Sequence, residues 1–191
     1  MSDFPDWLAS TLASDATEGQ GVLPSWIGAL KPDSRIVGRA FVALMSQDDN
    51  LSVREAMKVA HTPGTVLVVA GGSASRTATI GDLMALEMQQ AGIVALVTDG
   101  LVRDVRELRQ MQHFSVWCRG VTPIAPQKKG PAIVGGSISI AGIVIRDGDL
   151  VIADDDGVVI WPQDQIDALL IKAEAKWQQD NARLVRLQQK K

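Results

Sequence analysis

Three side chains that could do chemistry crowd into one short stretch, TDGLVRDVRE at residues 98–107, which follows an apolar run at residues 93–97. They are Asp99, Arg103 and Asp104. A guanidinium binds carboxylate groups through paired hydrogen bonds, and carboxylate oxygens are ligands that magnesium prefers. The stretch therefore suits a site for a small anion and a cation. It equally suits an ordinary helix start, because Asp104 and Glu107 have the spacing of a capping box.

A second loop, GGSASRTATIG at residues 71–81, runs into GDLMA at residues 81–85. Its glycines would let the backbone approach a ligand closely: Gly71, Gly72 and Gly81. The loop is neither a Walker A motif nor a GxGxxG fingerprint, so it gives little support for a nucleotide site. Open first-turn amide groups, which attract a carboxylate or a phosphate, are expected at Asp82, Leu83 and Met84. Asp82 could also favour the helix start by its charge alone, so a ligand site and plain capping both stay open.

Other chemically capable residues favour structural roles. His61 and His113 lie near expected helix ends, and the acidic run at residues 154–156 is expected to serve a hairpin turn rather than a cation. Cys118 is the only cysteine, which excludes disulfide bonds within the chain, and it is predicted to be a buried apolar thiol. The lysine pair at residues 128–129 is too short for a nucleic-acid patch.

The elements that must position the two loops alternate between strands and helices. Apolar runs predict buried strands at residues 35–45, 65–70, 93–99 and 115–119. Helices are predicted at residues 82–91 and 104–111, and a shorter one begins near Val53, where Ser52 and Glu55 have capping-box spacing. This order predicts a parallel sheet with crossover helices, in which loops at the carboxyl ends of the strands share one edge.

The two ends of the chain are predicted to add helices to this sheet. Residues 1–33 comprise a helix at about 3–13 and a loop, and the DDDG turn joins a β-hairpin of residues 150–153 and 158–161. A long helix fills residues 163–191, with an apolar stripe at Ile166, Leu169, Leu170, Ala173 and Trp177. Because this helix outlasts the core of its own domain, we expect it to lie on a neighbouring subunit of a homo-oligomer.

The bulk composition bounds the class of protein. The chain has 191 residues, 46% hydrophobic and 21% charged, which fits one α/β domain over residues 1–191. Its net charge of −3 is spread along the chain, which argues against nucleic acid as a partner. It has no apolar run long enough to span a membrane and no secretory signal, so a cytoplasmic location is expected.

The motifs resemble those of the family of ribonuclease E activity regulator A (RraA) and its relatives. That family includes metal-dependent 4-hydroxy-4-methyl-2-oxoglutarate/4-carboxy-4-hydroxy-2-oxoadipate aldolases. The most specific part is GDLMA followed about twenty residues later by DGLVRDVRE, which keeps R-D-x-x-E at Arg103, Asp104 and Glu107. With DNLSVREAMKVAHTPGTVLVV before these motifs and WCRGVTP and GDLVIADDDGVVIWP after them, the similarity covers about residues 34–163.

The resemblance implies a swivelling ββα-type domain that forms trimers or hexamers, with the active site between subunits. The turn that holds the pyruvate part of the substrate would be Gly81, Asp82, Leu83 and Met84. Arg103 would bind the substrate and act in catalysis, with help from Asp82 through water. Asp104 would hold Mg²⁺ or Mn²⁺, and a neighbouring subunit would add an acidic ligand, for which Glu174 and Asp180 are candidates.

The implied reaction is class II retro-aldol cleavage of a 4-hydroxy-2-oxo acid to pyruvate, with oxaloacetate decarboxylation as a side activity. A base removes the proton of the C4 hydroxyl group, and its identity is open. No lysine lies in the strand runs or in the two candidate loops, which argues against a Schiff-base aldolase. The alternative functions are a non-catalytic regulator that binds ribonuclease E or a related RNA-processing protein, and an inactive family member. Such regulators tend to be shorter, so the long terminal helix favours the enzyme.

Overall fold

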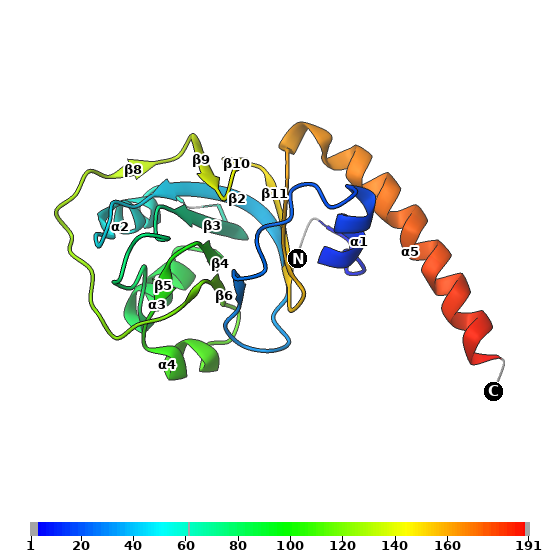
Figure 1. Cartoon of the computed structure of the whole chain (residues 1–191), viewed down its shortest axis with the longest axis horizontal. Coiled ribbons are helices and arrows are strands. Elements are labelled where there is room, and N and C mark those ends of the chain that lie inside the picture. The colour runs from blue at the N-terminus through cyan, green and yellow to red at the C-terminus, as the bar shows by residue number, and fades with distance from the viewer. Residues whose placement is uncertain (1–3, 61, 190–191) are drawn as a thin grey trace.

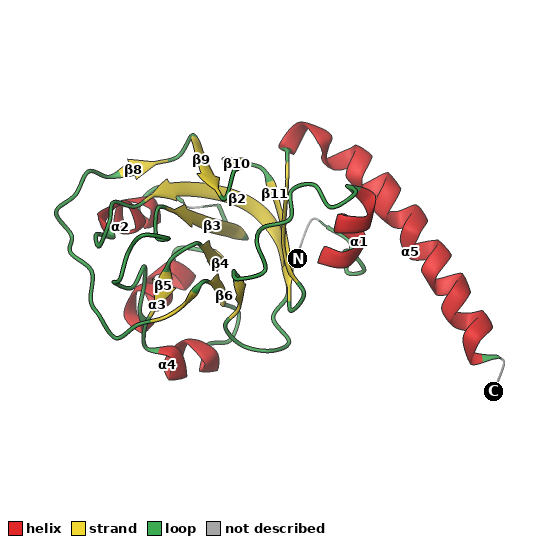
Figure 2. Cartoon of the chain, in the orientation of Figure 1, coloured by secondary structure: helices red, strands yellow, loops and turns green. Residues whose placement is uncertain are grey.

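The apolar runs form the parallel centre of one large sheet (Figures 1 and 2). The computed structural model describes residues 4–60 and 62–189. The parallel strands lie side by side in the order β6 (Ser115–Cys118), β4 (Ile93–Thr98), β3 (Thr65–Ala70) and β2 (Ile36–Leu44). All four were predicted, and their parallel pairing confirms the α/β class.

Antiparallel strands extend this centre on both sides. The predicted hairpin, β11 (Leu150–Asp154) and β12 (Gly157–Trp161), pairs with β2, and β1 (Gly28–Ala29) pairs with β6. Val22 bridges to Val159, so the segment before β1 links the two edges and nearly closes the sheet. The remaining strands are short: β5 (Leu101–Val102), β7 (Gly120–Val121), β8 (Ile133–Val134), β9 (Ser137–Ile140) and β10 (Ile143–Arg146).

The central strands are buried on both faces. On β3, Leu67 and Val69 face the core beneath the three short helices, whereas Val66 and Val68 face the interior that the curved sheet encloses. A strand covered on both faces is apolar throughout, which explains the continuous run that predicted it. The helices on the outer face are α2 (Leu51–Met57), α3 (Asp82–Gln90) and α4 (Val105–Gln110).

Helix α2 begins two residues earlier than the predicted start at Val53. The Ser52 hydroxyl donates to the Leu44 carbonyl oxygen at 2.6 Å and so does not cap the helix. Instead, Asp49 Oδ1 accepts from the Leu51 N–H at 2.9 Å. The predicted capping box of Ser52 and Glu55 is therefore wrong, because tertiary contacts claim the serine.

Helix α1 (Ser10–Ala16), in contrast, starts later than predicted. The predicted helix covers residues 3–13, of which residue 3 lies outside the described part of the chain. The first residue of α1, Ser10, donates its N–H to Asp154 Oδ2 at 2.8 Å and its hydroxyl to Asp154 Oδ1 at 2.5 Å. A carboxylate from the hairpin thus satisfies the helix start. The sequence of the first sixteen residues holds no sign of this cap.

The long C-terminal helix α5 (Ile166–Gln188) packs on α1 through its first half. Ile166, Leu169 and Ala173 are buried there, and Trp177 stacks on Trp7 with ring centroids 5.5 Å apart. Residues 181–189 are all exposed, and Figure 1 shows α5 leaving the body on the side away from α2. The predicted long helix and its apolar stripe are confirmed over residues 166–188. Residues 163–165 form a 3-10 turn instead, and residues 190 and 191 lie outside the described part of the chain.

Across residues 4–60 and 62–189, no helix combines the length and apolar character that crossing a membrane requires.

Candidate active site

The two predicted loops meet in the structure. The backbone N–H of Arg103 donates to the Ile80 carbonyl oxygen at 3.0 Å, and the backbone N–H of Thr79 donates to the Leu101 carbonyl oxygen at 2.6 Å. The chain after β4 therefore runs beside the chain that enters α3. Strand adjacency explains this contact, because β3 and β4 are parallel neighbours and their carboxyl ends share one edge of the sheet.

Asp104 turns its carboxylate away from its own helix. Its backbone lies in the left-handed region, with φ of 56°, and no side-chain cap bond forms at the start of α4. Its Oδ2 instead accepts from the Asp82 N–H at 3.3 Å and lies 3.2 Å from Arg103 Nε. The alternative that Asp104 and Glu107 form only a capping box is wrong. The Asp104 side chain is 35% exposed, so it is open to a further ligand.

Gly81 is the contact point between the two loops. A methyl group added there would overlap Asp104 Oδ2 and would lie 2.9 Å from Arg103 Nε. Its backbone has an ordinary extended conformation, so the glycine is needed for space and not for backbone freedom. The close approach holds the guanidinium and the carboxylate directly against the first turn of α3.

The first-turn amide groups of α3 are less open than predicted. The Asp82 N–H is used by Asp104, and the Leu83 N–H donates to the side chain of Asp82 at 2.7 Å. Two of the three expected donors are thus occupied, both by carboxylate oxygens. These contacts agree with the attraction of a helix start for anions, although the anions here belong to the protein itself.

Asp99 has a structural role. It is 5% exposed, and its carboxylate accepts from the Gly72 N–H at 2.7 Å and the Gly71 N–H at 3.3 Å. A methyl group at Gly72 would lie 2.7 Å from the Gly100 nitrogen. These two glycines therefore let two backbones pack together and do not line the pocket described below.

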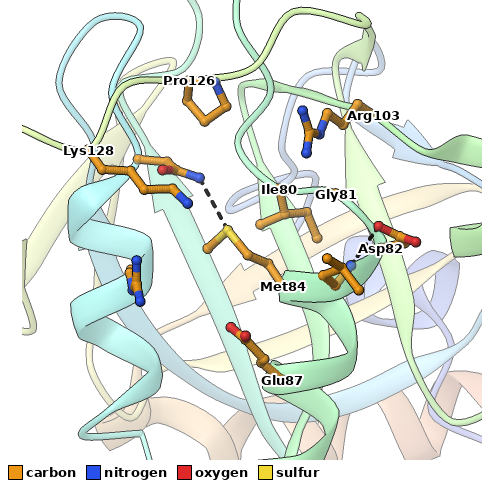
Figure 3. Close-up of a pocket in the computed structure, with 11 residues that line it drawn as sticks. Ile80, Gly81, Asp82, Met84, Glu87, Arg103, Pro126 and Lys128 are labelled. Carbon is orange, nitrogen blue, oxygen red and sulfur yellow. Dashed lines mark hydrogen bonds between the residues drawn. The ribbon is translucent and has the colours of Figure 1, made fainter.

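The joined loops form one wall of a pocket of about 200 Å³ (Figure 3). In this view Arg103, Gly81 and Asp82 lie on one side, Lys128 lies on the other, and Ile80 and Met84 lie between them. All five residues predicted for the substrate or its turn are there: Gly81, Asp82, Leu83, Met84 and Arg103. The further lining residues are Asn50, Arg54, Glu87, Pro126 and Lys128.

The sequence interpretation missed this second wall. Asn50 and Arg54 stand four residues apart at the start of α2, just after β2 ends, so they come from a third strand end on the same edge. That position could have identified them. Lys128 offered no such signal, because it lies in a proline-rich loop without regular structure.

Asp49 fixes the loop that carries Lys128. Its Oδ2 accepts from the N–H groups of Lys129 at 2.6 Å and Gly130 at 2.9 Å. Burial raises the pKa of Asp49, but the hydrogen bonds from Lys129, Leu51 and Gly130 outweigh burial and hold the pKa below its usual value. The carboxylate is 6% exposed and stays ionised, and it ties the rim of the pocket to the start of α2.

Lys128 reaches the pocket from outside the predicted strand runs and the two candidate loops. It is an exposed side chain on the pocket rim. A lysine that forms a Schiff base is normally desolvated in an apolar pocket or set beside another cation so that its amine is neutral. The exposure of Lys128 suits a cation that attracts anions.

The donor set of the site suits a magnesium-type ion held mostly by water and substrate oxygens. Asp82 lines the pocket, the Asp104 carboxylate lies beside it, and one or two carboxylates suffice for Mg²⁺. Within the described part of the chain, no cluster of three or more acidic, histidine or cysteine side chains is arranged to hold a metal. Glu174 and Asp180 lie on α5, outside the pocket lining, and Asp180 pairs with Lys176 at 3.4 Å.

The remaining candidates take structural positions where the chain is described, and His61 lies outside the described residues. Cys118 is buried, and burial raises the pKa of its thiol, which confirms the predicted apolar thiol. Asp154 caps α1, and Asp155 accepts from the Asp33 N–H at 2.9 Å. His113 is absent from the pocket lining.

Comparison with known proteins agrees with this geometry. The model of the RraA-like family, described as Aldolase/RraA, matches residues 10–160. A protein of Halalkalibacterium halodurans named as a candidate 4-hydroxy-4-methyl-2-oxoglutarate aldolase is 36% identical over 176 residues, which is 92% of this chain and 83% of that protein.

Two solved structures share the fold. Streptomyces coelicolor RraAS2, described as an unusual member of the RNase ES inhibitor RraA family, has a TM-score of 0.82 at 26% identity over 94% of this chain and 93% of its own. RraA from Thermus thermophilus, described as an RNA-processing inhibitor, has a TM-score of 0.73 at 28% identity, covering 82% of this chain and 93% of its own. The family match, the aldolase-named relative and these folds establish that the chain belongs to the RraA-like family.

Proposed function

We propose that this protein is a divalent-metal-dependent aldolase that cleaves a 4-hydroxy-2-oxo acid, such as 4-hydroxy-4-methyl-2-oxoglutarate, and releases pyruvate. One observation carries the proposal: the Arg103 guanidinium and the Asp104 carboxylate are held together against the first turn of α3, and Arg103, Gly81 and Asp82 line a pocket of about 200 Å³. That volume suits a small acid. The names of relatives add support from the family.

The charge of the pocket supports an anionic substrate. Its lining has three cations, Arg54, Arg103 and Lys128, against two acids, Asp82 and Glu87. A substrate with carboxylates at both ends could place one at Arg103 and the other toward the opposite cations. The planar guanidinium of Arg103 matches the carboxylate and keto oxygens of a 2-oxo acid.

In this proposal Arg103 stabilises the negative charge that develops on the keto oxygen when the C3–C4 bond breaks. Asp104 keeps Arg103 in place and would be the protein ligand of Mg²⁺ or Mn²⁺, with Asp82 reaching the ion through water. Such an ion, when bound, supplies a Lewis acid that polarises the keto group. Oxaloacetate decarboxylation develops the same charge, so we expect it as a side activity.

The exposed C-terminal half of α5 supports a homo-oligomer. This half carries Leu184, Val185 and Leu187, each at least 50% exposed among the residues that the structure describes. A neighbouring copy that covers this helix could also bring an acid such as Glu174 or Asp180 to a pocket of its partner. We therefore propose a trimer or hexamer, which sedimentation analysis would test.

A coupled assay tests the enzyme proposal. With Mg²⁺ or Mn²⁺, the protein should release pyruvate from 4-hydroxy-4-methyl-2-oxoglutarate and from oxaloacetate, detected through lactate dehydrogenase. Arg103→Ala should remove this activity. No pyruvate above the metal-only blank, together with an unchanged Arg103→Ala variant, would exclude the proposal.

The second candidate function is a regulator that binds ribonuclease E, and the RraA structures favour it. The argument from chain length does not separate the two, because the RraAS2 chain aligns over 94% of this chain. A ribonuclease-binding assay separates them. If the protein is a regulator, the unaltered protein and the Asp104→Ala variant should inhibit ribonuclease E equally well. If it is only an aldolase, neither should inhibit ribonuclease E.

A further inference from the structure

Asn50 carries an unpaired acceptor in the wall of the pocket. The side chain lines the pocket and is 1% exposed. Its Oδ1 has no donor within the described part of the chain, a condition it shares there only with the Thr77 hydroxyl, which does not line the pocket. Buried polar groups without partners are rare because each loses its hydrogen bonds to water. The site should therefore supply a donor from outside the chain.

The orientation of the amide is fixed. Asn50 Nδ2 donates to the Thr79 carbonyl oxygen at 2.8 Å and contacts Met84 Sδ at 3.2 Å (Figure 3 shows the second contact as a dashed line). Rotating the amide by half a turn would set Oδ1 against the Thr79 carbonyl oxygen, which has no proton to donate. The free atom is therefore the acceptor, and its ligand must donate.

We infer that Asn50 Oδ1 accepts a hydrogen bond from the C4 hydroxyl group of the substrate and thereby selects hydroxylated 2-oxo acids. This inference rests on the proposed function. The carboxylate and keto oxygens of a 2-oxo acid only accept hydrogen bonds, so they suit Arg103 and cannot satisfy Asn50. The hydroxyl group is the one donor on a 4-hydroxy-2-oxo acid whose carboxyl groups are ionised.

The surroundings of Asn50 suit this role. Oδ1 is covered in this structure, so the proposed contact requires a neighbouring side chain to move aside. The flexible end of Met84, which contacts Nδ2 of the same amide, is our candidate for that movement. Arg54, one helical turn along α2, and Lys128 also line the pocket and would receive the carboxylate beyond the hydroxyl carbon. Asn50 has no titratable proton, so it would orient the hydroxyl group and leave proton removal to another group.

A substrate comparison within each variant tests the inference. The measured quantity is kcat/KM for 4-hydroxy-4-methyl-2-oxoglutarate divided by kcat/KM for oxaloacetate, which has no C4 hydroxyl group. This ratio is independent of how much protein is folded, because both values come from one preparation. Asn50→Ala should lower the ratio about 10-fold or more, because a site built to bind a hydroxyl group loses its preference with that contact.

Two further variants make the result specific. Asn50→Asp retains an acceptor oxygen and should keep most of the ratio, even where the lost amide contact to Thr79 reduces stability. Thr77→Ala removes the other unpaired buried oxygen, outside the pocket, and should leave the ratio unchanged.

Failure of the inference about Asn50 and failure of the proposed aldolase function would give different results. If Asn50→Ala lowers both activities equally, or lowers neither, the inference is wrong and the aldolase proposal stands. If the unaltered protein forms no pyruvate from either substrate, the proposed function fails and the inference fails with it.

Discussion

The turn at residues 99–104 and the turn at residues 154–157 both bring aspartates to the end of a buried strand. In the second turn, Asp154 accepts three hydrogen bonds, from the N–H and hydroxyl of Ser10 and from the Asp156 N–H. In the first turn, the Asp99 carboxylate likewise accepts hydrogen bonds from the N–H groups of Gly71 and Gly72. Asp104 differs from both, because one of its two contacts, at 3.2 Å, is to a guanidinium and both involve only Oδ2.

The difference separates carboxylates that hold the fold from a carboxylate that can bind a ligand. Asp154 and Asp99 are saturated by donors of the backbone or a hydroxyl group, which ties distant segments together. The Asp104 side chain is 35% exposed and stands beside Arg103, which lines the pocket. Acidic residues at a strand end therefore indicate a function only when their oxygens are not already used by N–H or hydroxyl donors from elsewhere in the chain.

The largest effect should come from Asp104→Asn. Asparagine tolerates the left-handed backbone at this position and keeps the shape, so stability should change little. Loss of the charge removes the proposed cation ligand, and pyruvate release should fall about 1000-fold. The measurements are coupled kinetics and calorimetric binding of Mn²⁺. An Asp104→Asn variant with normal activity would place Asp104 in the same class as Asp154.

Gly81→Ala should also reduce activity strongly, by roughly 100-fold, because the added methyl group displaces Asp104 and Arg103 from their positions. Gly28→Ala is the matched control, since no atom lies within 4 Å of a methyl group there. Steady-state kinetics of both variants give the test. Equal activities would mean that the contact of the two loops is not needed for the reaction.

Asp154→Ala should affect stability and spare catalysis. Removing the carboxylate leaves the start of α1 without its acceptor, and the free energy of unfolding should fall by about 1–3 kcal/mol. The specific activity of the folded protein should remain unchanged. Urea unfolding measures the loss, and Asp156→Ala, which alters an exposed acid in the same turn, should lie within about 0.5 kcal/mol of the unaltered protein.

The smallest effect concerns Asp49 and pH. Because its pKa is lowered in the folded protein, its stabilising contribution is complete above the pKa of the unfolded chain, near 3.8. That contribution is lost as the pH falls below 3.8 through the lower pKa of the folded state. The free energy of unfolding, compared at pH 6 and near pH 3, should therefore fall less in Asp49→Asn. An identical fall would show that Asp49 does not anchor the loop of Lys128.

Much of the site was predictable because it depends on strand order. Two strand ends were recognised, their strands proved to be parallel neighbours, and their loops meet as expected at Arg103 and Gly81. The third strand end, with Asn50 and Arg54, was equally visible but was interpreted as a helix start alone. Of the open amide groups expected at the start of α3, those of Asp82 and Leu83 are occupied, because carboxylates of the protein accept their hydrogen bonds.

Other features had no local signal. The cap of α1 comes from Asp154, which is 144 residues from Ser10 in the chain. Lys128 reaches the pocket because Asp49 binds the N–H of the next residue, Lys129, which is 80 residues further along the chain. Hydrogen bonds across such separations form only after the sheet has brought the segments together. The capping box predicted at Ser52 failed for the same reason, since the Leu44 carbonyl oxygen competes for its hydroxyl group.

The sequence by itself determined the parallel strands, the hairpin, the long C-terminal helix and the paired Arg103 and Asp104. These features depend on hydrophobic periodicity and residue type, which can be read from a short stretch of sequence. Only the tertiary structure decided which aspartates are consumed by backbone donors, which residues form the second wall of the pocket and which way the Asn50 amide faces. Those outcomes depend on donors and acceptors from distant segments, and a carboxylate or amide reveals its role only when every neighbour that can bond to it is known.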